Sequence, residues 1–214
     1  ADAQCNLGVM YYKGRGVGQD ETEALAWFLR AAQQSNETAL NNLMVMCNRG
    51  NSAAQSGLGE MYEEGRGVLQ DDTEAANWYR KAARQGNPEA QFHLGQKYNN
   101  GEGVLQDYAE AAKWYLKAAK QGNIRAQINL GQMYRKGEGV PRNYEEAAKW
   151  YHKAAERGNA YAQNLLAGMY QEGRGFPQDY AEATQLYRKA AETGNVNAQV
   201  NLGMMYLSGK GVGQ

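Results

Sequence analysis

The stretch AQINLGQMYRKGEGVPRNYEEAAKWYHKAAERGN, from Ala126 to Asn159, decides the fold of this chain. Its pattern returns with a period of 36 residues, and five of its positions scarcely change. The constant residues are Ala126, Leu130, Gly131, Gly137 and Gly139 here, and Ala90, Leu94, Gly95, Gly101 and Gly103 in the copy before. A fixed period of this length indicates a solenoid, in which each unit buries its apolar face only against its neighbours.

Copies of this unit cover the whole chain when they are aligned in register. Complete copies span residues 1–36, 52–87, 88–123, 124–159 and 160–195, a partial copy spans 196–214, and a stunted copy spans 37–51. Because an array gains core with every unit added, we expect a single elongated repeat array over residues 1–214. The chain begins within the pattern and without a Met, so we expect it to be a fragment or processed form of a longer array.

Composition argues against several classes of partner. Lys and Arg together number 23, as do Asp and Glu, and this zero net charge argues against binding to nucleic acid or anionic lipid. No run approaches the roughly 18 apolar residues of a membrane span, so we expect no membrane insertion. Cys5 and Cys47 fall at the fifth and eleventh positions of the unit, on different faces of a helix. We therefore expect buried thiols and no disulfide between them.

The first half of each unit predicts a helix, which we call helix A. Its constant residues fall at positions 3, 7, 10, 11 and 14, a spacing typical of one buried helical stripe. An asparagine precedes each later copy and is expected to cap the helix: Asn36, Asn51, Asn87, Asn123, Asn159 and Asn195. Gly137 and Gly139 then end the helix, since a sharp turn there needs a positive φ.

The second half predicts another helix, which we call helix B. It begins at a residue pair with the spacing of a capping box, in which the first side chain accepts from the N3 amide and the Glu reaches back to the amide of the cap. The pairs are Asp20/Glu23, Asp71/Glu74, Asp107/Glu110, Asn143/Glu146 and Asp179/Glu182. The tryptophans recur on the apolar stripe that follows, so we assign them to the core rather than to a binding platform: Trp27, Trp78, Trp114 and Trp150.

A glycine in the middle of helix A costs about 1 kcal/mol relative to alanine. It nevertheless recurs in most copies, at Gly8, Gly59, Gly95, Gly131 and Gly203. We expect that helix B approaches closely at this position, where a side chain would overpack the contact.

The elements A-x-x-x-L-G-x-x-Y, G-x-G-V and E-A-x-x-W-Y recur in order at fixed spacing, and this pattern resembles the Sel-one-like repeat (SLR), a relative of the tetratricopeptide repeat. The resemblance implies an all-α fold, a right-handed α/α superhelix of 36-residue helix-turn-helix repeats. It also implies an adaptor role. Bacterial members are often exported and bind host, envelope or signalling proteins, which favours a periplasmic or secreted location, and eukaryotic members serve in endoplasmic-reticulum quality control. Some cysteine-rich relatives are linked to β-lactam binding or hydrolysis, but these carry disulfides in every repeat.

The stunted copy departs most from the pattern. It predicts one A-like helix from Glu37 to Asn48, joined to the next helix A by Arg49, Gly50 and Asn51. An odd helix reverses the direction of every later helix relative to the first hairpin, so we expect a kink or repacking near Met44 to Asn51. Because this helix has lost its own helix B, we also expect a flexible joint of low local stability. The alternative is that part of a repeat is absent from the sequence.

No motif predicts catalysis, a cofactor or a metal. Glycine pairs such as Gly65 and Gly67 lack the strand and third glycine of a nucleotide site, so we interpret them as helix ends. Acidic pairs such as Glu63 and Glu64 lie near turns, where carboxylates ordinarily cap or stay solvated. His93 and His152 have no zinc-ligand partner at a recognised spacing on their helices. We therefore expect no catalytic residue, no metal site and no cofactor.

Positions 2, 5, 6, 9, 12 and 13 of helix A lie opposite the constant stripe and form what we call the variable face, because their occupants differ between copies. We predict that this face lines a concave groove and binds a protein or peptide. The candidate partner-binding residues are Phe92, His93, Gln96, Asn99, Arg125, Ile128, Gln132, Arg135, Tyr161 and Leu165. Apolar residues in a row mark interaction sites, and the face carries Phe92, Ile128, Tyr161, Leu165, Val200 and Met204. The alternative is that neighbouring helices A cover these side chains.

The sequence therefore favours a protein–protein interaction scaffold that is not an enzyme. One alternative is a binder or hydrolase of cell-wall or β-lactam material, as the cysteine-rich relatives suggest, and another is a purely structural spacer. A nucleophile beside a base would favour an enzyme, but Ser35, Ser52, Ser56 and Ser208 have no histidine at a local spacing. The partner and the oligomeric state stay open.

Overall fold

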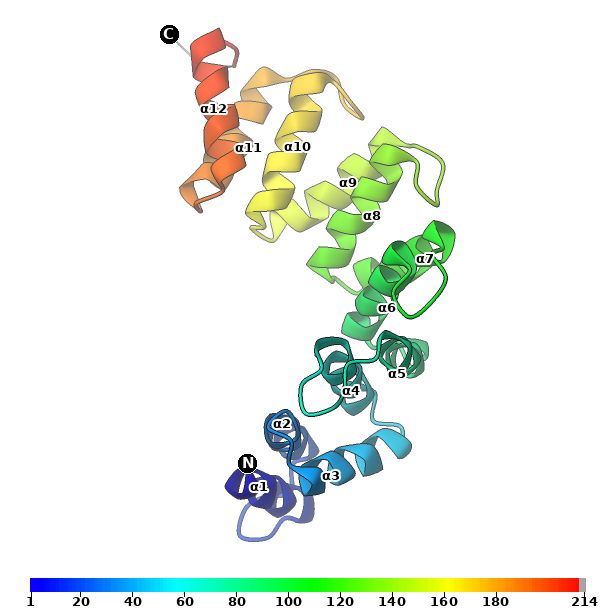
Figure 1. Ribbon diagram of the computed structural model, residues 1–214. Helices are drawn as coiled ribbons and strands as arrows, with labels where there is room; N and C mark the ends of the chain where they lie inside the picture. Colours follow the sequence, from blue (N-terminus) through cyan, green and yellow to red (C-terminus); the bar gives the residue numbers. More distant parts are fainter. Residues whose placement is uncertain (212–214) are drawn as a thin grey trace. The chain divides into compact units, whose positions relative to one another are not determined.

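The computed structural model describes residues 1–211, and this part of the chain is all-α. Twelve helices follow one another, with no strand among the described residues (Figure 1). They are α1 (Asp2–Lys13), α2 (Glu21–Ala32), α3 (Glu37–Asn48), α4 (Ser52–Glu64), α5 (Asp72–Arg84), α6 (Pro88–Asn100), α7 (Tyr108–Lys120), α8 (Ile124–Lys136), α9 (Tyr144–Glu156), α10 (Ala160–Glu172), α11 (Tyr180–Glu192) and α12 (Val196–Ser208). Residues 212–214 of the partial copy lie outside the described residues.

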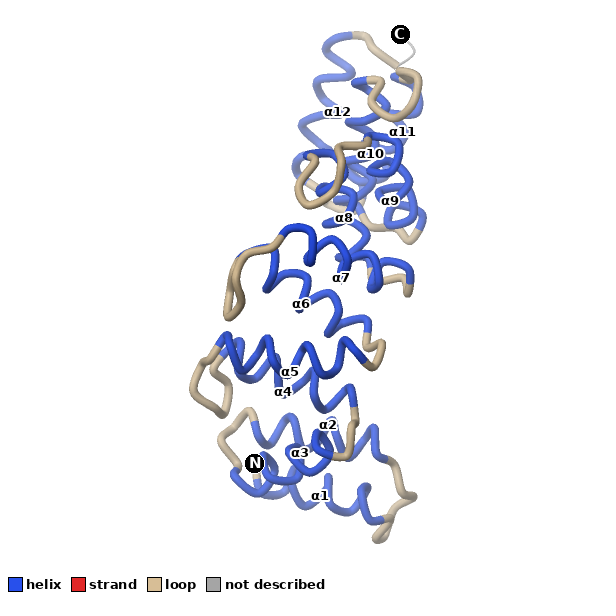
Figure 2. The backbone as a smooth tube through the Cα atoms, turned by 90° about the vertical axis from the view of Figure 1, so that its right-hand side faces the viewer, coloured by secondary structure: helices blue, strands red, loops and turns tan. Residues whose placement is uncertain are grey.

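The chain divides into two compact units, Ala1–Asp107 with α1 to α6 and Tyr108–Gln214 with α7 to α12. Within the units, a helix A packs against the helix B that follows it, in the hairpins α1–α2, α4–α5, α8–α9 and α10–α11. Loops join the two helices of each hairpin (Figure 2). The all-α class and the helix-turn-helix repeats are thereby confirmed, while a single array over residues 1–214 stays a prediction.

Asparagine caps begin the helices A as predicted. The side-chain oxygen of Asn123 accepts from the amide of Ala126 at 2.9 Å, which satisfies one of the free donors of the first turn. The same bond begins α3, α4, α6, α10 and α12. At the other end, Gly137 has a φ of 80° and donates its amide to Met133. Both ends of helix A therefore follow from the sequence.

The capping box of helix B is only half confirmed. Asp71 accepts from the amides of Thr73 and Glu74 at 2.9 and 3.0 Å. The amide of the cap itself donates not to a Glu side chain but to the carbonyl of the constant tyrosine near the end of helix A. This backbone bond recurs in five copies: Asp20 to Tyr11, Asp71 to Tyr62, Asp107 to Tyr98, Asn143 to Tyr134 and Asp179 to Tyr170. The backbone of helix A thus satisfies the donor that the Glu was expected to satisfy.

The mid-helix glycine makes room for helix B in three copies. A Cβ added at Gly8 would lie 2.7 Å from Phe28, one at Gly59 would lie 2.8 Å from Tyr79, and one at Gly131 would lie 2.5 Å from Tyr151. For Gly203 the prediction is wrong, because nothing lies within 4 Å of an added Cβ. The close contact therefore depends on the aromatic residue of the following helix B.

Tryptophan packing on helix B is confirmed for Trp78 and Trp150, which are buried, whereas Trp27 and Trp114 are half-buried. A lysine three residues further along the helix lies over the ring in three copies. The distances from the Nζ to the ring centroid are 3.6, 4.0 and 4.3 Å for Lys81, Lys117 and Lys153. These lysines therefore form cation–π contacts in addition to their place near the helix C-terminus.

The stunted copy forms the predicted helix, α3, and this helix combines two roles. It begins as a helix A, with the side chain of Asn36 accepting from the amide of Ala39. It ends as a helix B, because Gln55 Nε2 donates to the Cys47 carbonyl at 2.9 Å. The same glutamine position donates to the last turn of a helix B in regular copies, as Gln91 does to Ala83 and Gln127 does to Ala119. One helix therefore replaces a hairpin.

The predicted reversal after α3 is visible in the first unit. In a regular copy, a Cβ added at Gly103 would lie 2.0 Å from the carbonyl of Asp72, at the start of α5. The equivalent Cβ at Gly67 would lie 1.9 Å from the carbonyl of Ala32, at the opposite end of the preceding helix B. The loop after α4 thus packs on the C-terminal end of α2, which is what an odd helix requires.

The helix α3 has no helix B of its own, as predicted, but its packing argues against a flexible joint there. Leu43, Met46 and Cys47 are at most 2% exposed, and α3 packs against both α2 and α4. We therefore expect the amides of residues 43–47 to exchange as slowly as those of residues 130–134, which are equivalent in α8. Native-state hydrogen exchange measures this, and clearly faster exchange in residues 43–47 would reinstate the joint.

Candidate partner-binding site

The constant stripe of helix A is buried in the core, so only the variable face of this helix is left for contacts with a partner. In α8 the stripe residues Ala126, Leu130 and Met133 are at most 2% exposed. Side chains beside this stripe are the ones left to make other contacts. The ten predicted partner-binding residues fall into both units, with four on α6 and six on α8 and α10.

On α6 the prediction needs one correction. Phe92 is only 2% exposed, so it is a packing residue and offers no apolar group to a partner. His93 stacks on Tyr79 with ring centroids 4.9 Å apart, and its side chain is 15% exposed. Gln96 and Asn99 are half-buried and remain accessible.

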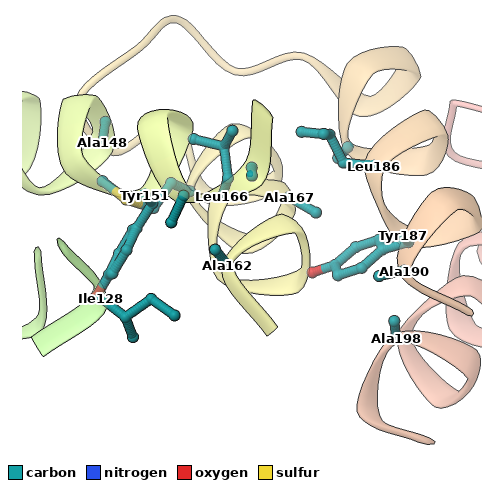
Figure 3. Close-up of a cluster of buried hydrophobic side chains, with 14 of the residues drawn as sticks. Ile128, Ala148, Tyr151, Ala162, Leu166, Ala167, Leu186, Tyr187, Ala190 and Ala198 are labelled. Carbon is teal, nitrogen blue, oxygen red and sulfur yellow. The ribbon is translucent and has the colours of Figure 1, made fainter. Parts of the chain in front are cut away.

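On α8 and α10 one further residue must be corrected. Ile128 is 7% exposed and belongs to a core cluster that includes Ala162 and Leu166 of α10 (Figure 3). A neighbouring helix A therefore covers position 5 in this copy. Arg125 is exposed, and Tyr161 is 42% exposed. Gln132 Nε2 donates to the Tyr161 hydroxyl at 3.1 Å, so these two predicted residues do lie together.

The remaining predicted residues, Arg135 and Leu165, line a common hollow in the second unit. It has a volume of about 300 Å³ and is walled by α8, α10, α11, α12 and the loop after α10. We call it the α10 hollow. Besides Arg135 and Leu165, its lining includes Asn164, Gly168, Gln171, Tyr187 and Asn201. The variable faces of three successive helices A thus converge on one concavity.

Gly168 opens the hollow, and sequence analysis missed it. At the same position of helix A the other complete copies and the partial copy carry larger side chains: Val9, Glu60, Gln96, Gln132 and Met204. The nearest atom to a Cβ added at Gly168 would be the Tyr187 hydroxyl at 3.6 Å, which is an ordinary contact. Figure 3 shows this hydroxyl directed toward α10. The signal in the sequence was the pair Ala167-Gly168. In the other complete copies and the partial copy, glycine comes first and a larger residue follows it, as in Gly131-Gln132.

Arg135 brings a positive charge without a carboxylate partner to the hollow. Its Nε is buried without a hydrogen-bond partner, and no carboxylate of a described residue lies within ion-pair distance of it. The guanidinium lies near Tyr151, where burial raises the pKa of the phenol to about 12 and the charge of Arg135 opposes that rise. Arg174 also lines the hollow, but its Nε pairs with Glu172 at 3.0 Å.

Side-chain amides supply the other polar groups of the hollow. Asn201 Nδ2 donates to Asn164 Oδ1 at 3.0 Å, which leaves one NH2 group and one oxygen of this pair available. Gln171 Oε1 accepts from the Tyr187 hydroxyl at 2.8 Å, which leaves the NH2 group of Gln171 for a ligand. These NH2 groups add donors to that of Arg135, while the carboxylate of Glu172, which also lines the hollow, pairs with Arg174.

The first unit contains a second polar cluster that sequence analysis missed, centred on Lys97. Its side chain is 1% exposed, and its Nζ lies 2.8 Å from Glu63, 2.7 Å from Asp72 and 3.2 Å from Glu102. The signal was available in the sequence, because a methionine holds this position in the other copies: Met10, Met46, Met61, Met133, Met169 and Met205. A lysine on a constant apolar stripe is a departure that needs buried partners.

The carboxylates around Lys97 differ in their pKa. Burial alone would raise the pKa of Glu63, but contacts with His93, Lys97 and Tyr79 outweigh it and lower the pKa to about 2. For Glu60, burial outweighs the opposing charge of His93 and raises the pKa of the carboxyl. The carboxylates of Glu63, Asp72 and Glu102 pair with Lys97, so this cluster needs no charged partner from outside the first unit. It acts as a structural clamp that joins α4, α5 and the loop after α6.

The described residues hold no group of His, Cys, Asp and Glu suited to a metal ion. None of the helices in this part of the chain is long and apolar enough to cross a membrane. Cys5 and Cys47 are buried free thiols, as predicted. His152 is on the surface, with its side chain 51% exposed.

Comparison with known proteins identifies the repeat. A family model described as the Sel1 repeat matches residues 1–36, 52–87, 88–123, 124–159, 160–195 and 196–214, and it leaves out the stunted copy. No curated protein matches the sequence.

Solved structures of similar proteins include c5321, a protective antigen of uropathogenic Escherichia coli that displays an SLR fold. It is 40% identical with a TM-score of 0.76, and the match covers 97% of this chain and 41% of that chain. A Sel1 repeat protein from Oxalobacter formigenes is 34% identical with a TM-score of 0.71, covering 94% of this chain and 64% of the other. A putative Sel1 repeat protein from Klebsiella pneumoniae, 18% identical with a TM-score of 0.51, shares the fold. This chain thus spans less than two thirds of the first two proteins.

Proposed function

This chain belongs to the Sel1 repeat family, whose members commonly serve as protein-interaction scaffolds, and from that premise we propose that it binds a partner protein or peptide through the variable faces of its helices A. The observation that carries this proposal is the α10 hollow, in which variable-face residues of α8, α10 and α12 converge. Such a concavity suits a peptide or a projecting segment of a partner.

The accessible part of the proposed surface is smaller than the sequence predicted. Without Phe92 and Ile128, its centre in the second unit consists of Gln132, Tyr161 and Leu165 beside the hollow. Tyrosine suits this role, since it combines a large apolar ring with a polar tip and is enriched among residues that dominate binding energy. The proposal includes no catalytic step. The cell-wall alternative gains no support, because the disulfides of the cysteine-rich relatives are not formed by Cys5 and Cys47.

Site-specific photo-crosslinking tests the proposal. A photoreactive phenylalanine analogue placed at Gln132, on the variable face, should crosslink a partner in the native cellular extract. The same analogue at His152 of α9, which is solvent-accessible but belongs to a helix B, should not. Crosslinks of equal strength at both positions, or only at His152, would move the binding surface away from the helices A.

A further inference from the structure

We infer that the α10 hollow recognises an acidic side chain of a partner peptide, with Arg135 as the residue that binds the carboxylate. This inference rests on the proposed function and specifies its chemistry. The hollow joins an open volume, a cation without a carboxylate partner and amide donors at one place in the second unit. The clamp around Lys97 does not combine them, because its lysine already pairs with three carboxylates.

Arg135 indicates that the ligand is acidic. A guanidinium held partly away from water loses hydration, and a protein ordinarily compensates this with a carboxylate. The described residues provide none for Arg135, whereas they provide Glu172 for Arg174 in the same hollow. Arginine binds carboxylates through two parallel hydrogen bonds, which gives both strength and geometric selection.

The amides around Arg135 fit the same ligand. Gln171 has a free NH2 group because its oxygen accepts from Tyr187, and the Asn164–Asn201 pair has another. These donors match the carbonyl oxygens of a peptide backbone beside the bound side chain. Leu165 and Met169 add apolar lining, so the best segment carries an aliphatic residue near its Asp or Glu.

Gly168 makes the site specific to one repeat. Other copies fill the equivalent space with a side chain, for example Gln96 and Gln132. Replacing Gly168 by Gln should therefore close the hollow while leaving α10 intact, because glutamine is a better helix former than glycine and the added Cβ meets only an ordinary contact. The melting temperature of G168Q should not fall.

A selection of displayed random peptides on the full chain tests the inference. On the wild type, enriched peptides should carry an Asp or Glu beside an aliphatic residue, and this enrichment should disappear on R135Q and on G168Q. A synthetic peptide from the selection should bind R135Q about 10- to 100-fold more weakly, as expected for a hydrogen-bonded charge pair. Changing its acidic residue to the amide should cause a similar loss, and the two losses should not add.

A control variant in the same hollow shows whether binding depends on Arg135 in particular. R174Q removes a charge from the same hollow, but Arg174 already pairs with Glu172, so binding should change less than about threefold. Enriched peptides without an acidic residue, or acidic peptides indifferent to R135Q and G168Q, would overturn the inference and leave the proposed function standing. No enrichment on the wild type would count against both. If inorganic phosphate alone gives the same Arg135-dependent rise in melting temperature, the hollow is a general anion site and the peptide assignment fails.

Discussion

Replacing Gly131 by Leu should lower the free energy of unfolding by about 3 kcal/mol, whereas Gln132→Leu should change it by less than about 0.5 kcal/mol. A Cβ at Gly131 would lie 2.5 Å from Cε1 and 2.8 Å from Cδ1 of Tyr151. Tyr151 is fully buried, so its ring has no free space into which to move. Leucine is a better helix former than glycine, but that gain of about 1 kcal/mol is smaller than the overpacking cost.

The chain supplies a matched control for this substitution at the same position of the unit. Nothing lies within 4 Å of a Cβ at Gly203, so Gly203→Leu should be neutral or stabilise the protein by up to about 1 kcal/mol. Urea unfolding of all three variants followed by circular dichroism measures the differences. Similar losses for the two glycine variants would mean that backbone conformation, and not the aromatic ring of helix B, requires glycine.

Helix boundaries and caps could be predicted because they depend on residues close in sequence. Asn36 begins α3 and Gly137 ends α8 through bonds within a few residues of each helix end. The 36-residue period and the capping residues together therefore determine the local helix-turn-helix hairpin. The expected Glu contact failed because the tyrosine carbonyl of the preceding helix competes for the same amide, and a spacing rule does not include that neighbour.

Burial on the variable face could not be predicted from one helix. Position 5 lies opposite the constant stripe, which suggested that Phe92 and Ile128 were exposed. Ile128 instead packs in a cluster with residues of α10, so the next helix A of the array determines its exposure. Tyr161, at the second position, stays 42% exposed. The alternation between covered and open positions arises from contacts between repeats.

Gly168 and Lys97 show what the constant pattern concealed. Both are departures at single positions, one where larger residues recur and one where methionine recurs. Lys97 lies on the constant stripe, so variation on the variable face does not reveal it. Gly168 lies on the variable face, but a glycine has no side chain that would suggest a contact with a partner. Departures from the repeat are thus as informative as its variable positions.

Replacing Lys97 by Ala should also cost about 3 kcal/mol of stability near neutral pH. The substitution removes the cation that lies between Glu63, Asp72 and Glu102. It leaves Glu63 with the Tyr79 hydroxyl at 2.5 Å and His93 Nδ1 at 3.5 Å. It also leaves a cavity where a 1%-exposed side chain had packed. Lys97→Met separates the loss of the charge from the cost of the cavity. Methionine, the residue of the other copies, restores most of the volume, so that only the charge is removed. Its loss should be about 1–2 kcal/mol.

Lowering the pH should reduce the loss of unfolding free energy caused by Lys97→Met, because Glu63 becomes protonated. Its folded-state pKa is lowered from 4.5 to about 2, so the stability it contributes is fully present above pH 4.5 and is lost as the pH falls toward 2. A shift of this size corresponds to at most about 3 kcal/mol, and Lys97 shares it with His93 and Tyr79. In the variant the pKa of Glu63 should rise toward its ordinary value, so less stability remains to be lost in acid.

The measurement compares urea unfolding of the wild type, Lys97→Met and Lys97→Ala in steps from neutral pH into the acid range. The wild type and Lys97→Met should converge as Glu63 becomes protonated, while Lys97→Ala should keep the part of its loss that comes from the cavity. The alkaline side is a poorer test, because Lys97 and Tyr79 both have raised pKa values. The stability that each raised pKa contributes is fully present below the ordinary pKa of the group and is lost as the pH rises through its folded-state pKa, so the two contributions would not be separated. A constant difference between the wild type and Lys97→Met at every pH would mean that Lys97 stabilises the first unit by packing alone, and that its three carboxylates interact with water more than with the lysine.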